Sequence, residues 1–136
     1  MNTLEEGCQL QMDFRKLKKV AAASEDVVPV AIQHADTREV LLVAYTNEYA
    51  FNESLRQRSL ILWSTSRNEL WQKGKTSGQS FELIEARVNC EQNSLLYVVR
   101  PHQGGICHTK NRRGEPRNCY YRKVDFDSRK LENMDA

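Results

Sequence analysis

The sequence has no apolar run that approaches the length of a membrane-spanning helix, about 20 residues. Its start, MNTLEEGCQLQMDF, lacks the basic residues and the apolar stretch of a secretory signal. Aromatic residues make up only 8% of the 136 residues, and no repeat, low-complexity tract or linker is evident. We therefore predict a cytoplasmic protein without a membrane partner, folded as a single domain over residues 1–136 with its core at about 28–124 and polar extensions at both ends.

Charge of one sign is also scarce, because the formal net charge is only +2. Proteins that bind nucleic acids usually carry a strongly basic domain or stripe, so this balance argues against a nucleic-acid partner. The cations are nevertheless unevenly distributed, and six of them crowd one stretch near the C-terminal end: Lys110, Arg112, Arg113, Arg117, Arg122 and Lys123. The stretch is either a solvated loop or a site for an anion such as phosphate.

The hydrophobic pattern predicts an α+β domain that is dominated by a sheet, with short helices in the N-terminal half. The spacing of apolar residues predicts a helix at about 14–22 behind Asp13 as N-cap, and a second helix within 46–59. A hairpin is predicted from β-branched runs on either side of the turn DTRE. The further predicted strands are 60–66, 69–73, 80–88, 94–101 and 119–126.

In a reducing cytosol the four cysteines are not expected to form a disulfide framework, so each is a candidate metal ligand, nucleophile or small buried residue. Cys8, near a polar terminus, is the least constrained. Three thiolates and one open position form a ligand set that catalytic zinc accepts, and Cys90, Cys107 and Cys119 can supply it. Their spacing alone favours inert buried cysteines over zinc ligands. The flanking loops, and His108 beside Cys107, favour zinc; His108 is then a ligand, a general base or a surface residue.

A second polar cluster, LWSTSRNELWQKGKTSGQS, combines hydroxyls and cations with two glycines. Such a set can hold phosphate through side chains and exposed amides, although turn formation explains the glycines equally well. Trp63 and Trp71 could each stack on a base or simply belong to the core. The candidate binding residues of this cluster are Ser64, Ser66, Arg67, Trp71, Lys73, Thr76 and Ser77.

Taken in order, the segments VAIQHADTREVLLVAYTNEYA, LWSTSRNELWQKGKTSG, RVNCEQNSLLYVV, CHT and NCYYR resemble phosphoribosyl-AMP cyclohydrolase of histidine biosynthesis, over roughly residues 28–123. The resemblance implies a homodimer with its active site at the interface, a phosphorylated nucleotide-like substrate, and a catalytic zinc held by the matching Cys90, Cys107 and Cys119. His108 matches a candidate general acid or base. The serines, threonine, arginine and lysine of the second cluster match the substrate-binding motifs of the family.

The implied reaction adds water to C6 of an N1-substituted adenine and breaks the N1–C6 bond. This hydrolysis needs a hydroxide at neutral pH, which zinc supplies by lowering the pKa of its bound water to about 7. A nearby histidine can carry the proton. The two phosphoribosyl groups of the substrate require cations and hydroxyls, which the two polar stretches contain.

Three departures from the family pattern fall on the predicted site. The family's aspartate-rich DCDxD segment, understood to bind magnesium, is replaced by a segment with Asn89, Glu91 and Asn93 around Cys90. Gln79 stands where the family has a histidine after TSG. The third departure is HTKNRRGEPRN, between Cys107 and Cys119, which is longer than the family's turn.

Loss of carboxylates weakens the attraction for magnesium, so we expect magnesium to be dispensable and Arg112 and Arg113 of the basic loop to neutralise substrate phosphate instead. Three hypotheses follow: the histidine-pathway cyclohydrolase itself, a related zinc hydrolase that opens or deaminates another nucleotide or cyclic amidine, and a non-catalytic module that binds zinc or a nucleotide.

Overall fold

The computed structural model describes residues 3–23, 26–72, 80–102 and 109–136. Its largest element is a four-stranded sheet with the strand order β2-β1-β6-β5. Strand β1 is antiparallel to β2 and parallel to β6, and β5 is antiparallel to β6. The strands are β1 (Val28–His34), β2 (Val40–Thr46), β5 (Phe81–Val88) and β6 (Leu95–Pro101).

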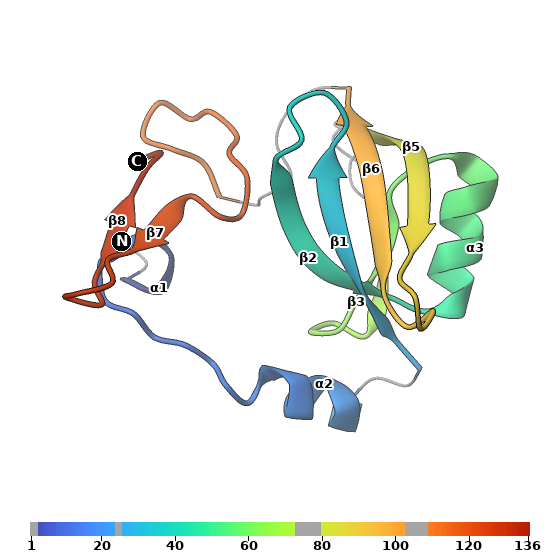
Figure 1. Cartoon of the computed structure of the whole chain (residues 1–136), viewed down its shortest axis with the longest axis horizontal. Coiled ribbons are helices and arrows are strands. Elements are labelled where there is room, and N and C mark those ends of the chain that lie inside the picture. The colour runs from blue at the N-terminus through green and yellow to red at the C-terminus, as the bar shows by residue number, and fades with distance from the viewer. Residues whose placement is uncertain (1–2, 24–25, 73–79, 103–108) are drawn as a thin grey trace.

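A helix and a hairpin lie between β2 and β5 in sequence and cover one face of the sheet (Figure 1). Helix α3 (Glu48–Gln57) begins at Asn47, whose side chain accepts a hydrogen bond from the amide of Ala50 at 2.9 Å. It ends at Arg58, which adopts a left-handed conformation. Strands β3 (Ile61–Ser64) and β4 (Glu69–Gln72) form the antiparallel hairpin that follows.

The core lies between this sheet and the α3–β3 segment. Apolar residues at alternate positions of the strands point to the same face, where they pack against leucines of β3 and its approach. Ser54 is the fully buried polar residue that joins α3 to β3: its hydroxyl donates to the carbonyl of Ile61 at 2.7 Å and accepts from the amide of Ile61 at 3.1 Å. The core residues are Val30, Ile32, Leu41, Leu60, Leu62, Phe81, Leu83, Tyr97 and Val99.

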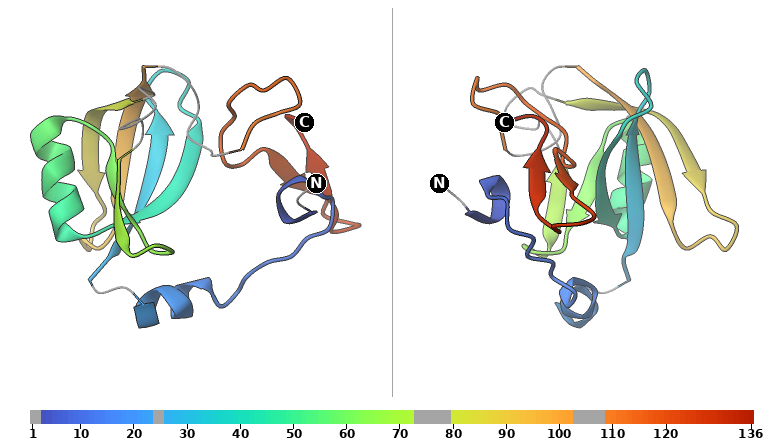
Figure 2. Two further views of the ribbon diagram at one scale, coloured as in Figure 1. Left: turned by 180° about the vertical axis from the view of Figure 1, so that it is seen from behind. Right: turned by 60° about the vertical axis from the view of Figure 1, so that its left-hand side comes forward.

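The two chain ends meet in a smaller group of elements, which we call the terminal unit and define as residues 3–8 and 109–136. It contains helix α1 (Thr3–Glu6) and the hairpin of β7 (Arg122–Val124) and β8 (Leu131–Asn133). Figures 1 and 2 show it beside the β2 edge of the large sheet. Helix α2 (Lys16–Ala23) follows the extended segment that leads from the terminal unit back to β1.

The α+β prediction is confirmed, since the sheet dominates and all described helices precede residue 58. The predicted strand at 119–126 was too long, because the Asp125 carboxylate accepts from the amides of Asp127 and Ser128, each at 2.9 Å, and turns the chain after Val124. Strand β8 was not predicted. None of the helices in the described ranges has the length and apolar character needed to cross a membrane.

The predicted helix at 14–22 forms two residues later, as α2. The side chain of Asp13 still serves its start, because it accepts from the amide of Arg15 at 3.0 Å. Much of the apolar face predicted for this helix is exposed among the described residues: Phe14 and Leu17 are 89% and 68% exposed, whereas Val20 is buried.

We predict that Ser54→Ala lowers the free energy of unfolding by about 1–2 kcal/mol, because it removes two hydrogen bonds in a site from which water is excluded. Urea unfolding followed by circular dichroism measures the change. Asn52→Ala, on the exposed face of the same helix, is the matched control and should leave the midpoint nearly unchanged. Equal midpoints for the two variants would show that the Ser54 contact does not stabilise the fold.

Candidate active site

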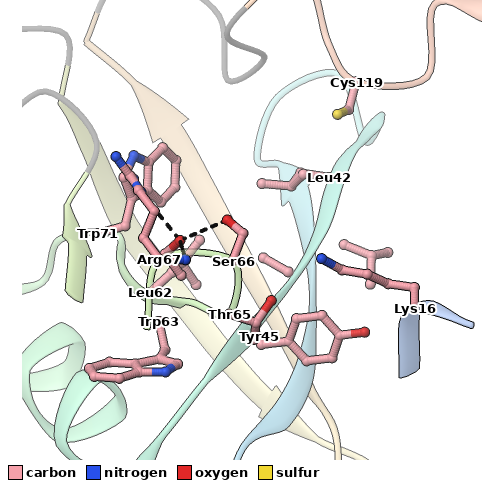
Figure 3. Close-up of a pocket in the computed structure, with 13 residues that line it drawn as sticks. Lys16, Leu42, Tyr45, Leu62, Trp63, Thr65, Ser66, Arg67, Trp71 and Cys119 are labelled. Carbon is pink, nitrogen blue, oxygen red and sulfur yellow. Dashed lines mark hydrogen bonds between the residues drawn. The ribbon is translucent and has the colours of Figure 1, made fainter. Parts of the chain in front are cut away.

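The structure has a hollow of about 600 Å³ between the outer edge of β2 and the β3–β4 hairpin. Figure 3 shows hydroxyls and a guanidinium on the hairpin side, Lys16 of α2 on the opposite side, and Cys119 at one end. The lining residues are Lys16, Leu42, Val43, Ala44, Tyr45, Leu62, Trp63, Ser64, Thr65, Ser66, Arg67, Trp71 and Cys119.

Ser64, Ser66 and Arg67, predicted from the sequence to bind substrate, all line the hollow. Ser64 is the last residue of β3, and Ser66 and Arg67 lie on the turn that follows (Figure 3). The Ser64 hydroxyl organises this turn, because it accepts from the amide of Arg67 at 3.3 Å and lies 3.3 Å from the hydroxyl of Ser66. Asn68 closes the turn with a positive φ of 53°. Arg67 also pairs with the exposed Glu69 at 3.4 Å, and a phosphate would have to compete with that weak surface contact.

Aromatic side chains form the less polar part of the hollow. Trp71 lies opposite Leu62 in the β3–β4 pairing, is half-buried and packs against the core, yet it also lines the hollow. Trp63 and Tyr45 line it as well. Both functions considered for Trp71, packing in the core and offering a face to a base, are therefore compatible with its position.

Cys119 is held at the rim by the backbone. Its amide donates to the carbonyl of Leu41 at 3.0 Å, which attaches the segment to the edge of β2. The thiol is exposed. Burial, followed by the negative charge of the adjacent Cys119 when ionised, raises the pKa of Tyr120. Cys119 can thus present sulfur to the same hollow as Ser66 and Arg67.

Cys90 lies at the opposite end of the large sheet. One row of paired residues crosses it from β5 to β2: Val88, Leu95, Val30 and Ala44. From this row, Cys90 lies two residues beyond Val88. Leu41, whose carbonyl binds the Cys119 amide, lies three residues before Ala44. Because β5 and β2 run in the same direction, these two offsets lead toward opposite ends of the sheet. With a rise of about 3.3 Å per residue and a strand spacing of about 4.8 Å, the two cysteines are about 20 Å apart.

Two thiolates on one zinc ion lie only about 4 Å apart, since each Zn–S bond measures about 2.3 Å. Within one chain, Cys90 and Cys119 therefore cannot bind the same ion. The described part of the chain also contains no group of three His, Cys, Asp or Glu residues that could hold a metal. The soft sulfur donors suit zinc, but these two can meet on one ion only when two chains contribute.

Comparison with known proteins identifies the family. The family model described as phosphoribosyl-AMP cyclohydrolase matches residues 42–121. The chain is 40% identical over 101 residues to a phosphoribosyl-AMP cyclohydrolase of Archaeoglobus fulgidus, covering 74% of this chain and 88% of that protein. A Caulobacter vibrioides protein with the same name is 40% identical over 103 residues, covering 75% of this chain and 70% of the relative. The chain belongs to the phosphoribosyl-AMP cyclohydrolase family.

One relative is a longer, bifunctional protein. The histidine biosynthesis bifunctional protein HisIE of Aquifex aeolicus is 38% identical over 114 residues, which cover 84% of this chain but only 52% of that protein. The family model begins within β2 and ends just before β7. Helices α1 and α2, strand β1 and the β7–β8 hairpin therefore lie outside the segment that the phosphoribosyl-AMP cyclohydrolase model matches.

Several residues expected in the site of a phosphoribosyl-AMP cyclohydrolase lie outside the described residues. These are Lys73, Thr76, Ser77, Gln79, Cys107 and His108. Ser80 follows residues 73–79, His102 precedes residues 103–108, and the two are hydrogen-bonded to each other. The amide of His102 donates to the carbonyl of Ser80 at 3.0 Å, and the Ser80 hydroxyl lies 2.6 Å from the His102 ring nitrogen Nδ1. Ser80 and His102 are thus joined at the end of the β5–β6 pair.

The segment around Cys90 that was predicted to be a degenerate magnesium site forms a turn closed by its own side chains. The Asn89 side-chain oxygen accepts from the amides of Asn93 and Ser94, each at 2.9 Å. The Asn89 side-chain nitrogen donates to the Asn93 side-chain oxygen at 2.7 Å, and the Asn93 side chain donates to Glu91 at 3.4 Å. Both carboxamide oxygens therefore already accept hydrogen bonds from within the turn.

The cations of the 110–123 stretch divide into different environments. Arg117 is buried, and Arg113 pairs with Glu115 at 2.8 Å on the surface. Arg112 is exposed. Lys16, which lines the hollow, was missed by the sequence analysis, because nothing in KLKK distinguishes the lysine that folds back toward the β3–β4 turn from its neighbours.

Proposed function

We propose that the protein is the phosphoribosyl-AMP cyclohydrolase of histidine biosynthesis and that it acts in the cytoplasm as a zinc-dependent homodimer. The observation that carries the proposal is the hollow in which Ser64, Ser66 and Arg67 share one wall with an exposed cysteine at its rim, in a chain of this family. A reducing compartment would keep the exposed thiols of Cys90 and Cys119 available as ligands.

The proposed reaction adds water across the N1–C6 bond of the purine. The water oxygen becomes the carbonyl oxygen of a carboxamide at C6, and the N1–C6 bond breaks. One water proton goes to N1, which keeps its ribosyl group, and the other goes to the exocyclic nitrogen on C6. Arg67 and the hydroxyls of the β3–β4 turn would bind a phosphate. Trp71 would stack on the base. His108 would move the proton from water to N1.

Zinc would be held by Cys90 of one chain and by Cys107 and Cys119 of the other, and when bound it would supply Lewis-acid activation of water near neutral pH. The separation of about 20 Å between Cys90 and Cys119 in one chain supports this division of the ligands. A homodimer would bring the two ends of the sheet together through a two-fold axis and form two equivalent sites.

The direct test of the function is turnover of phosphoribosyl-AMP, followed by absorbance, with the full-length chain loaded with zinc. Turnover supports the proposed reaction. A zinc-bearing chain that leaves phosphoribosyl-AMP unchanged would contradict it. Hydrolysis of another nucleotide would then favour a divergent paralogue, and full protein coordination of zinc would favour a binding module.

We predict about one zinc per chain and loss of most of it in Cys90→Ser, Cys107→Ser and Cys119→Ser, because each change removes one of three soft ligands. Elemental analysis of the purified variants measures the zinc content. Cys8→Ser is the matched control, since this exposed thiol belongs to the terminal unit and is not needed as a ligand. Full occupancy in the variants of the three proposed ligands would refute the ligand assignment.

We predict that His108→Ala lowers kcat roughly a hundredfold or more, the usual scale for loss of a general acid or base, while zinc content stays unchanged. Single-turnover kinetics and elemental analysis give the two readouts. His34→Ala serves as a control, because the His34 ring accepts from the backbone amides of Asp36 and Thr37 in the β1–β2 turn. Loss of zinc together with activity would make His108 a ligand instead.

We predict that millimolar magnesium leaves the kcat of the zinc-loaded enzyme essentially unchanged, because hard cations need charged or available oxygen ligands and the Asn89 and Asn93 side chains bond within their own turn. Asn89→Asp combined with Asn93→Asp should introduce a magnesium response. Arg112→Ala should raise KM if this exposed cation neutralises phosphate, whereas Arg129→Ala, in the β7–β8 turn, should not. A strong magnesium requirement in the parent enzyme would overturn this account.

A further inference from the structure

The long segment between Cys107 and Cys119 is folded rather than extended in solvent. Lys110 and Pro116 form an antiparallel bridge, which brings the two arms of the segment together. The buried Asn111 closes the tip, because its side-chain oxygen accepts from the amides of Arg113 at 3.0 Å and Glu115 at 2.9 Å. The segment is thus a short hairpin with defined ends.

Arg117 joins the two arms of this hairpin at its base. Its Nε donates to the hydroxyl of the buried Thr109 at 3.0 Å. Thr109 stands two residues after Cys107 and directly after His108, and Arg117 stands two residues before Cys119. The contact between Arg117 and Thr109 therefore joins the two ends of the hairpin, each two residues from a proposed zinc ligand in the sequence.

The other contacts of Arg117 reach both ends of the chain. Its guanidinium forms an ion pair with Glu6 of α1 and donates to the backbone carbonyl of Asp135 at 2.8 Å. The same group stacks on the ring of Tyr121, 3.5 Å from the ring centre. The Tyr121 hydroxyl in turn donates to the carbonyl of Glu5 at 2.6 Å. Both chain ends that contact Arg117 lie outside residues 42–121, which the family model matches.

Burial of the Arg117 side chain makes the loss of any of these polar contacts energetically unfavourable. The side chain of Arg117 is only 1% exposed, and a guanidinium keeps its charge in proteins. A buried charge that loses its partner is strongly unfavourable, so removing Glu6 should displace Arg117 rather than leave it in place. Displacement would open the base of the hairpin and release the segment whose Cys119 amide is attached to Leu41 of β2.

We infer that Arg117 is a positioning residue for the zinc site: held by Glu6 and the C-terminal backbone, it fixes the base of the 109–117 hairpin and so sets the place of Cys119. The inference rests on the proposed function only in taking Cys119 as a zinc ligand. It gives the two chain ends a part in metal binding, and it assigns Arg117 to the support of the site rather than to substrate phosphate.

The test compares full-length Glu6→Gln and Arg117→Met with the parent chain. Glu132→Gln is the matched control, because Glu132 pairs with Lys123 at 3.8 Å in the same terminal unit but with both side chains exposed. Zinc affinity is measured by competition with a chromogenic chelator. The absorption spectrum of the cobalt(II)-loaded protein reports the arrangement of the thiolate ligands.

We expect Glu6→Gln and Arg117→Met to weaken zinc binding about 10–100-fold, the usual effect of removing a residue that supports a metal ligand. Their cobalt spectra should change, while the far-ultraviolet circular dichroism and the zinc affinity of Glu132→Gln should match the parent. If Arg117→Met does not fold, Glu6→Gln, a change of one charge at similar size, still decides the question.

Parent zinc affinity and an unaltered cobalt spectrum in Glu6→Gln, with only a lower melting temperature, would overturn the inference and leave Arg117 a purely structural residue. Cys119→Ser in the parent background separates this failure from failure of the proposed function. Normal zinc binding by Cys119→Ser would refute the ligand assignment itself, and the inference with it. Loss of zinc in Cys119→Ser but not in Glu6→Gln would overturn the inference alone.

Discussion

The hydrogen bond between the Cys119 amide and the Leu41 carbonyl, 3.0 Å long, is the contact on which the arrangement of the site depends. It fixes Cys119 at one edge and one end of the large sheet, next to the β3–β4 turn. Cys90 follows β5, the strand at the opposite edge, and lies at the opposite end of the sheet. The sheet therefore keeps the two thiols about 20 Å apart. A single chain therefore presents the proposed ligand Cys90 at one end of the sheet and the proposed ligand Cys119 at the other.

The same arrangement explains how the rest of the chain is used. The β3–β4 turn and β2 bound a hollow with hydroxyls, cations and aromatic rings near Cys119, a composition that suits a phosphorylated nucleotide. The terminal unit braces the segment that carries Cys119 through the buried Arg117 and its partner Glu6. At the opposite end, the side chains of Asn89 and Asn93 close the turn around Cys90 by bonding to each other.

Local patterns predicted the α+β class, the β1–β2 hairpin and the clustering of Ser64, Ser66 and Arg67, because alternation and turn chemistry are short-range signals. They could not predict that Arg117 is buried, since a stretch with six cations looks solvated until Glu6, more than a hundred residues away, is placed beside Arg117. Lys16 was missed because its place also depends on segments distant in the sequence. Strand β8 was missed because its three residues, Leu131–Asn133, are too few to show an alternating pattern, although its partner β7 is close in the sequence. The distance between Cys90 and Cys119 likewise follows from strand order, which spacing in the sequence does not encode.

The central claim, that each zinc site takes ligands from two chains, is tested most directly by mixing Cys90→Ser and Cys119→Ser proteins after subunit exchange. A heterodimer of two such chains contains one site with all its cysteines and one that lacks both. If subunits assort randomly around a two-fold axis, the mixture should regain about a quarter of the parent zinc and turnover, although each variant alone has little of either. No recovery, despite exchange shown by mass spectrometry, would contradict the shared site.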